Sequence, residues 1–87
     1  MKVKIFWREG CPKCPPAKEL GQKLKDQGLD VQLLGFDEAE GLTEATIHQV
    51  MATPSIIVVD DKDNEVSSWR GETPDISEVK KVLKLMN

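Results

Sequence analysis

The 87-residue sequence lacks several features that mark membrane, nucleic-acid-binding and zinc-binding proteins. No apolar run approaches the ~20 residues that a transmembrane helix needs. Lysine and arginine form no run with interleaved aromatic side chains, so we expect no binding of nucleic acid. One histidine, His48, and one pair of cysteines fall short of the four ligands of a structural zinc site. These absences predict a globular domain without a membrane, nucleic-acid or structural zinc site.

The N-terminal segment, residues 1–10, also lacks the features of a signal peptide. Its apolar stretch is short, and no small-residue cleavage site follows it. We therefore expect a cytoplasmic protein, and a purely structural disulfide would be unusual there because cytosolic thiols are kept reduced. The length and a hydrophobic fraction of 39% fit a single domain, residues 1–87, with a modest core. We expect this domain to be a monomer.

The net charge of −3 is unevenly distributed along the chain. Residues 1–25 hold seven basic and two acidic side chains, whereas residues 26–65 hold one basic and ten acidic side chains. Both cysteines lie in the basic portion. A positive surface around them would favour the thiolate form and acidic partners. Scattered solvated charge explains the same distribution, so both interpretations stay open.

Hydrophobic periodicity predicts seven elements in the order β-α-β-α-β-β-α. The expected strands are residues 2–7, 30–37, 54–60 and 65–71, and the expected helices are residues 17–28, 40–51 and 73–86. The run 54–60 is continuously apolar, which is typical of a strand buried on both faces. Parallel pairing of the first two strands would make a right-handed βαβ unit. The sequence thus predicts an α/β domain with one four-stranded mixed sheet covered by three helices.

Each predicted helix has an apolar face. For the third helix, the sequence also indicates where the helix begins. Thr73 is the expected N-cap of the third helix, and Pro74 suits its first position. His48, inside the second helix, is expected to be solvated. The side chains expected to face the core are Ala17, Leu20 and Leu24 in the first helix, Leu42, Ala45 and Val50 in the second, and Ile76, Val79, Leu83 and Met86 in the third.

The stretch "REGCPKCPPAKEL", residues 8–20, contains the only two cysteines. Cys11 and Cys14 fall where the first strand gives way to the first helix. A helix N-terminus offers unpaired N–H groups and a partial positive charge, so we expect the pKa of a cysteine there to fall. The spacing of three predicts both sulfurs on one helix face, close enough to join. Such a pair can exchange disulfides: a Cys11 thiolate attacks, and Cys14 then releases the partner.

Prolines and one lysine crowd this helix start. Pro12 suits the first turn, where no hydrogen-bonded N–H is lost. Pro15 and Pro16 are expected to delay or kink the helix just past Cys14, because a proline beyond the first turn removes a helix bond. Lys13, between the cysteines, either adds positive potential or is simply a solvated side chain.

The segments "GCPKC" and "ATPSIIVV", together with the order of elements, resemble the glutaredoxin and thioredoxin-like redoxins. The likeness spans almost the whole chain and matches the short glutaredoxin form. It implies a thioredoxin-like fold, with Cys11 as the nucleophile and Cys14 as the resolving cysteine of a redox-active disulfide. It also implies a cis peptide bond before Pro54, with the backbone of Thr53 offered to an extended substrate segment.

Two departures from the glutaredoxin pattern bear on the reductant. Lys13 stands where glutaredoxins commonly have an aromatic, and "WRGETPD" has a single glycine, Gly71, in place of the Gly-Gly turn that helps to hold glutathione. This stretch is similar to the W-x-G-x-x-P-D pattern of glutaredoxin-like redoxins that thioredoxin reductase reduces and that serve ribonucleotide reductase. Trp69 and Gly71 match it, as do Pro74 and Asp75, and we expect Pro12, Lys13, Trp69 and Gly71 to modulate the site.

The resemblance therefore favours a cytoplasmic reductase of protein disulfides with thioredoxin-like activity. It implies no bound cofactor, electrons from a thioredoxin reductase, and disulfide-containing proteins such as ribonucleotide reductase as partners. A glutathione-dependent glutaredoxin is the alternative within the same family. Two hypotheses of other classes also stay open: a metal carrier that uses the two thiolates alone, and an interaction domain whose cysteines are incidental.

Overall fold

The computed structural model describes residues 1–85 and confirms the predicted order of elements. The strands are β1 (Lys2–Trp7), β2 (Val31–Gly35), β3 (Ser55–Val59) and β4 (Glu65–Arg70), and the helices are α1 (Cys14–Asp26), α2 (Ala39–Ile47) and α3 (Ile76–Leu85). Met86, predicted to face the core, lies outside the described residues.

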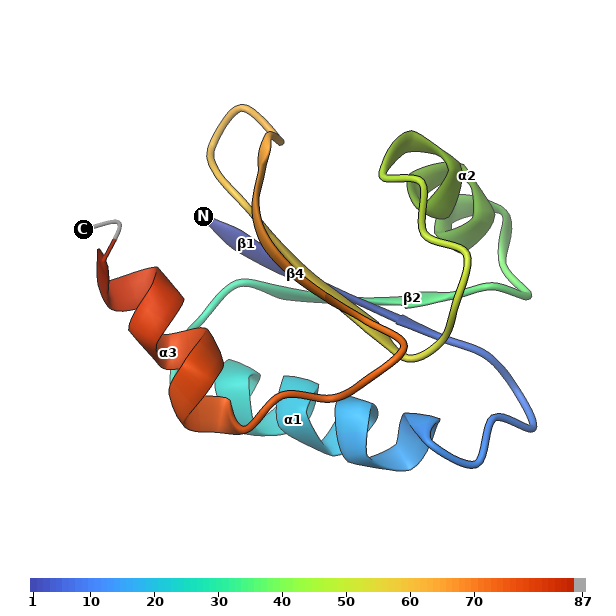
Figure 1. Ribbon diagram of the computed structural model, residues 1–87, viewed down its shortest axis with the longest axis horizontal. Coiled ribbons are helices and arrows are strands. Elements are labelled where there is room, and N and C mark those ends of the chain that lie inside the picture. Colours follow the sequence, from blue (N-terminus) through green and yellow to red (C-terminus); the bar gives the residue numbers. More distant parts are fainter. Residues whose placement is uncertain (86–87) are drawn as a thin grey trace.

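The four strands form one mixed sheet in the order β2-β1-β3-β4. β1 pairs in parallel with β2 and antiparallel with β3, and β3 pairs antiparallel with β4. Helices α1 and α3 cover one face, and α2 covers the other (Figure 1). The two central strands, β1 and β3, are therefore buried on both faces, which agrees with the continuous apolar run of β3.

The helices divide the core into two apolar clusters on opposite faces of the sheet. The cluster under α1 and α3 includes Ile5, Leu24, Ile56 and Val79. The cluster under α2 includes Phe6, Leu34, Ala45, Val50 and Ile57. Alternate residues of β1 and β3 supply the two clusters, as the two-residue period of a strand requires.

Helix α1 begins earlier than the sequence predicted. Its first residue is Cys14, and it continues without a break to Asp26, so the expected delay past Cys14 is wrong. Pro15 and Pro16 occupy the first turn, where backbone N–H groups have no partner within the helix and a missing N–H costs little. Pro12 was expected in that turn but instead precedes the helix.

Helix α2 is shorter than predicted and presents a different face to the sheet. It ends at Ile47. Leu42, expected in the core, is 53% exposed, whereas Gly41 and Ala45 are buried. A Cβ on Gly41 would overlap the backbone carbonyl of Gly35, so α2 rests on the end of β2 by close backbone contact. This contact rotates Leu42 outward.

Helix α3 begins after Asp75, so the prediction of Thr73 as its N-cap and Pro74 as its first residue is wrong. The Ser77 N–H donates to the Asp75 carboxylate (3.1 Å), and the Asp75 N–H donates to the Glu78 carboxylate (3.1 Å). The two bonds cap the start of α3 much as a capping box does, except that the Asp75 carboxylate bonds to the N–H of the second helical residue rather than the third. The predicted inner stripe is confirmed, because Val79 and Leu83 are buried and Ile76 packs against the same cluster.

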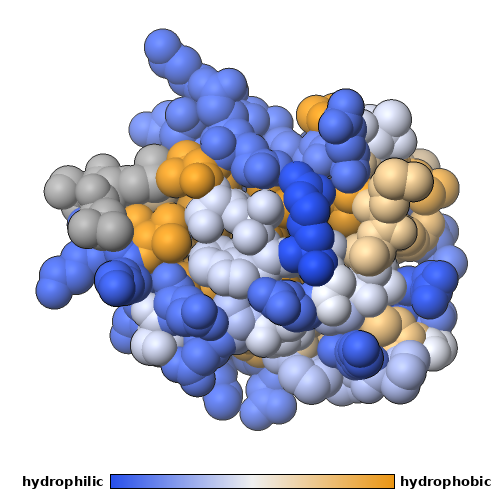
Figure 2. Space-filling model, in the orientation of Figure 1, coloured by the Kyte–Doolittle hydropathy of each residue, from blue (hydrophilic) through white to orange (hydrophobic). Residues whose placement is uncertain are grey.

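The surface is mainly hydrophilic on the face shown in Figure 2, with the apolar atoms divided among separate areas. Large apolar side chains with substantial exposure are Leu42, Ile47, Met51 and Val66. Within residues 1–85, none of the helices combines the length and the apolar character that crossing a membrane requires.

Candidate functional site

The two cysteines are joined in a disulfide whose Cα atoms lie 5.4 Å apart. Gly10, with φ of 75°, lets the chain turn sharply as it leaves β1. The turn is closed by the Cys11 N–H donating to the Arg8 carbonyl (3.3 Å) and by the Cys14 N–H donating to the Cys11 carbonyl (3.3 Å). Cys11 is 7% exposed and Cys14 is 2% exposed, so Cys11 is the more accessible of the two.

The disulfide lies at the N-terminus of α1. Only Cys14 belongs to the helix, so the expectation that both sulfurs share one helix face is wrong: Cys11 lies in the preceding turn. Lys13 is the N-cap residue and makes no side-chain capping bond, and the first turn carries no acidic residue. The partial positive charge of the helix end is therefore not offset by a carboxylate of the helix itself, which favours a thiolate after reduction.

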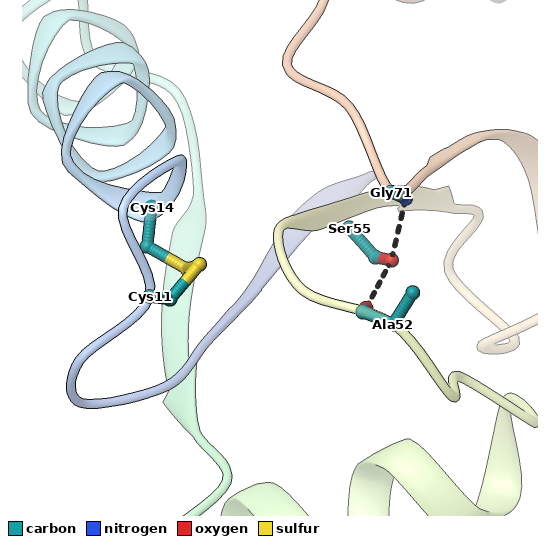
Figure 3. Close-up of a disulfide and its surroundings, with 5 residues drawn as sticks. All are labelled: Cys11, Cys14, Ala52, Ser55 and Gly71. Atoms are coloured by element: carbon teal, nitrogen blue, oxygen red, sulfur yellow. Dashed lines mark hydrogen bonds between the residues drawn. A yellow bond between two sulfur atoms is a disulfide. The ribbon is translucent and has the colours of Figure 1, made fainter.

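The loop between α2 and β3 lies opposite the disulfide (Figure 3). The peptide bond between Thr53 and Pro54 is cis, as the family resemblance implied. Pro54 is buried, and the paired residues of β3 begin only at Ser55. Among residues 1–85, no backbone hydrogen bond outside the helices and strands involves Thr53.

A groove of about 420 Å³ separates this loop from the cysteine turn. Its lining residues are Pro12, Lys13, Pro16, Pro54, Gly71, Glu72 and Thr73. Pro12, Lys13, Pro54 and Gly71 are therefore brought together as the sequence suggested. Trp69 is not among the lining residues and instead packs against the core cluster under α1 and α3.

Thr73 and Ser55 are site residues that the sequence analysis did not identify. Thr73 Oγ1 is buried without a hydrogen-bond partner in the described part of the chain. The Ser55 hydroxyl donates to the Ala52 carbonyl (2.7 Å) and accepts from the Gly71 N–H (3.4 Å). A hydroxyl inside a buried strand gives no sequence signal by itself, because its partners come from two separate loops.

A second polar cluster lies on the α2 face of the sheet. Lys4, at the centre of β1, is 2% exposed, and its ammonium contacts Glu44 (2.8 Å), Asp63 (2.6 Å) and His48 Nε2 (3.1 Å). Burial alone would lower the pKa of Lys4, but its bonds to Asp63 and Glu44 outweigh burial and raise it. The bond from Lys4 in turn lowers the pKa of Asp63. The prediction of a solvated His48 is wrong, since this side chain is buried against Lys4.

The carboxylates of this cluster and His48 are close enough to hold a metal ion. Donor atoms of Glu44, His48 and Asp63 lie within 4.8 Å of one another. The ammonium of Lys4, however, lies among them and bonds to all three. Lys4 thus neutralises the carboxylates in the way that a bound cation would, and the cluster connects β1, α2 and the β3–β4 turn.

A disulfide at the first helix of a βαβ unit, facing a cis-proline loop on a four-stranded mixed sheet, defines a thioredoxin-like redox protein. The family model for the thioredoxin domain matches residues 1–84, and the chain belongs to this family. The predicted thioredoxin-like fold and the resemblance to glutaredoxins and thioredoxins are thereby confirmed.

Glutaredoxins are among the relatives that this chain matches in sequence. Glutaredoxin 1 of Escherichia coli (strain K12) is 40% identical over 55 residues, which are 62% of this chain and 65% of that protein. The glutaredoxin of Haemophilus influenzae is also 40% identical over 55 residues, which are 63% of its length. The matching region thus spans less than two thirds of either relative.

Solved structures with the same fold include thioredoxins. Thioredoxin 1 from Thermosipho africanus TCF52B has a TM-score of 0.72 at 20% identity, over 99% of this chain and 93% of that one. Thioredoxin O2 from Arabidopsis thaliana in its oxidized state has a TM-score of 0.74 at 15% identity, over 98% of this chain and 73% of that one. At these identities the likeness establishes the fold alone.

Proposed function

We propose that this protein is a cytoplasmic thiol–disulfide oxidoreductase that reduces disulfides of other proteins through Cys11 and Cys14. The observation that carries the proposal is the disulfide beside a groove whose opposite wall contains a cis-proline. Cys11 is the more exposed of the two cysteines and is the proposed nucleophile. Cys14, at the first helical position, is the proposed resolving cysteine.

The proposed reaction transfers two electrons in two exchange steps. The Cys11 thiolate attacks one sulfur of a substrate disulfide. A mixed disulfide forms, and the other substrate sulfur leaves as a thiolate that takes up a proton. Cys14 then loses its proton and attacks Cys11, which closes the Cys11–Cys14 disulfide and releases the second substrate sulfur as a thiol. A reductase or a thiol must return two electrons and two protons before the next cycle.

We propose that Thr53 holds the substrate segment during attack. Its backbone is free to pair with an extended chain, as in recognition by strand addition. Ribonucleotide reductase is one candidate substrate, on the likeness of "WRGETPD" to redoxins that serve it.

A thioredoxin reductase is the favoured electron donor, because a single glycine, Gly71, stands where glutaredoxins have the Gly-Gly turn that helps to hold glutathione. Glutathione is the second candidate, since glutaredoxin 1 of Escherichia coli is 40% identical over the matched region. Both donors require the same cysteine chemistry and differ in how the disulfide is restored to the dithiol.

An insulin reduction assay with two reducing systems tests the proposal. The protein is assayed once with NADPH and thioredoxin reductase, and once with NADPH, glutathione and glutathione reductase. We expect insulin reduction with the first system and at least tenfold slower turnover with the second, and none with Cys11→Ser in either. Faster turnover with glutathione would identify a glutaredoxin. Absence of turnover in both, or activity of Cys11→Ser, would refute the proposed function.

A further inference from the structure

Ser55 connects the two segments that form the wall of the groove opposite the cysteines (Figure 3). It is the first residue of β3, it is 0% exposed, and its hydroxyl bonds to both segments. It donates to the Ala52 carbonyl, just before the cis bond, at 2.7 Å. It accepts from the N–H of Gly71, just after β4, at 3.4 Å.

Gly71 and Ala52 are also packed close together. Gly71 has a φ of 77°, and a Cβ built on it would lie 3.9 Å from the Cβ of Ala52. The Ser55 hydroxyl lies between these segments and satisfies a carbonyl of one and an amide of the other. Without it, the Ala52 carbonyl and the Gly71 N–H would each lose the hydrogen bond that ties its segment to β3.

We infer that Ser55 is a positioning residue for protein substrates. It does not touch the sulfurs in this arrangement; it acts through Ala52 and Gly71. The bond to the Ala52 carbonyl spans the turn that contains Thr53 and Pro54, and so fixes the direction in which the Thr53 backbone faces. The bond to Gly71 fixes the neighbouring part of the groove wall. This inference rests on the proposed function, because it assigns Ser55 to binding of the substrate backbone.

The inference separates two kinds of disulfide substrate. A protein segment must pair with the Thr53 backbone along the groove, so its binding depends on the position of the loop. A small disulfide such as 2-hydroxyethyl disulfide or DTNB needs only access to Cys11. Loss of the hydroxyl should therefore slow reduction of protein disulfides while leaving the reaction with small disulfides unchanged.

Ser55→Ala tests this separation, with Ser68→Ala as the matched control. Ser68 lies in β4 on the same face of the sheet, paired with Ile57. For Ser55→Ala we expect kcat/KM for insulin to fall about tenfold, mainly through a higher KM, and the rate with DTNB to stay within twofold. Ser68→Ala should match the wild type with both substrates. Equal losses with insulin and DTNB, or no loss with insulin, would overturn the inference.

If Ser55→Ala fails to fold, two other variants of nearly equal side-chain volume provide the same test. Ser55→Thr retains the hydroxyl and adds a methyl group, whereas Ser55→Val has a second methyl group in place of that hydroxyl and nearly the same volume as threonine. The ratio of insulin to DTNB rates should remain near the wild-type value for Ser55→Thr and fall about tenfold for Ser55→Val. Equal ratios for the two variants would contradict the positioning role. A wild-type protein that does not reduce insulin would instead refute the proposed function itself.

Discussion

Replacement of Lys4 by methionine tests whether the buried polar cluster holds the α2 face together. The ammonium of Lys4 makes three contacts, to Glu44, Asp63 and His48. Removing one partner of a buried ion pair costs about 3–5 kcal/mol, because the other charge is left buried. Here the side chains of Glu44 and Asp63 are 23% and 51% exposed, so water solvates part of the carboxylate charge that is left unpaired. Methionine also fills the volume of the lysine stem, and we expect a loss of about 2 kcal/mol.

Thermal unfolding of the oxidised protein at neutral pH, followed by circular dichroism, measures this loss. A destabilisation of about 2 kcal/mol in a domain of this size lowers Tm by roughly 8–16 °C. Lys2→Met is the matched control, since Lys2 lies on the same strand but is only partly buried; its Tm should change by less than about 3 °C. A Lys4→Met protein whose Tm stays within that same margin would refute the assigned role of the cluster.

The remaining predictions concern stability and use denaturant unfolding. The pKa of Asp63 is lowered from 3.8 and that of Lys4 is raised from 10.5. The contribution of this ion pair to the free energy of unfolding is therefore complete at pH values between those two ordinary pKa values. It is lost as the pH falls through the lowered pKa of Asp63, and it is lost again as the pH rises through the raised pKa of Lys4. Asp63→Asn should accordingly lose less stability on acidification than the wild type, and equal acid slopes would contradict the assignment. Gly41→Ala should cost about 2 kcal/mol or more, because its Cβ would meet the Gly35 carbonyl; a cost under about 0.5 kcal/mol would show that α2 does not rest on this contact. Thr73→Val should leave stability unchanged or raise it by up to about 1 kcal/mol, since the buried Oγ1 has no hydrogen-bond partner to lose among residues 1–85. A loss exceeding about 1 kcal/mol would indicate that this hydroxyl is bonded.

The order of elements could be predicted because each strand and helix carries a strong local pattern. The continuous apolar run of β3 and the inner stripe of α3 are examples. The start of α1 could not be placed by counting prolines alone. Whether Pro15 and Pro16 break a helix depends on whether they fall in its first turn, and this depends on how the Cys11 turn ends.

The cysteine pair and the cis-proline were also recognisable, since the motifs themselves are local. The residues that the sequence could not place are polar and buried by contacts between distant segments. Lys4 alternates with Val3 and Ile5 as an exposed residue would, and only the approach of α2 and the β3–β4 turn buries it. Ser55 likewise acquires its role from Ala52 on one side and Gly71 on the other.

Trapping of a mixed disulfide tests the central claim of the account most directly, namely that Cys11 attacks substrate disulfides and Cys14 resolves the product. Reduced Cys14→Ser and Cys11→Ser proteins are each incubated with insulin, quenched by alkylation and analysed by mass spectrometry. The account predicts an insulin adduct that accumulates on Cys11 in Cys14→Ser, and at least about tenfold less adduct in Cys11→Ser, whose remaining cysteine is the less exposed of the two. Equal adducts on both variants, or an adduct on Cys14 alone, would contradict it.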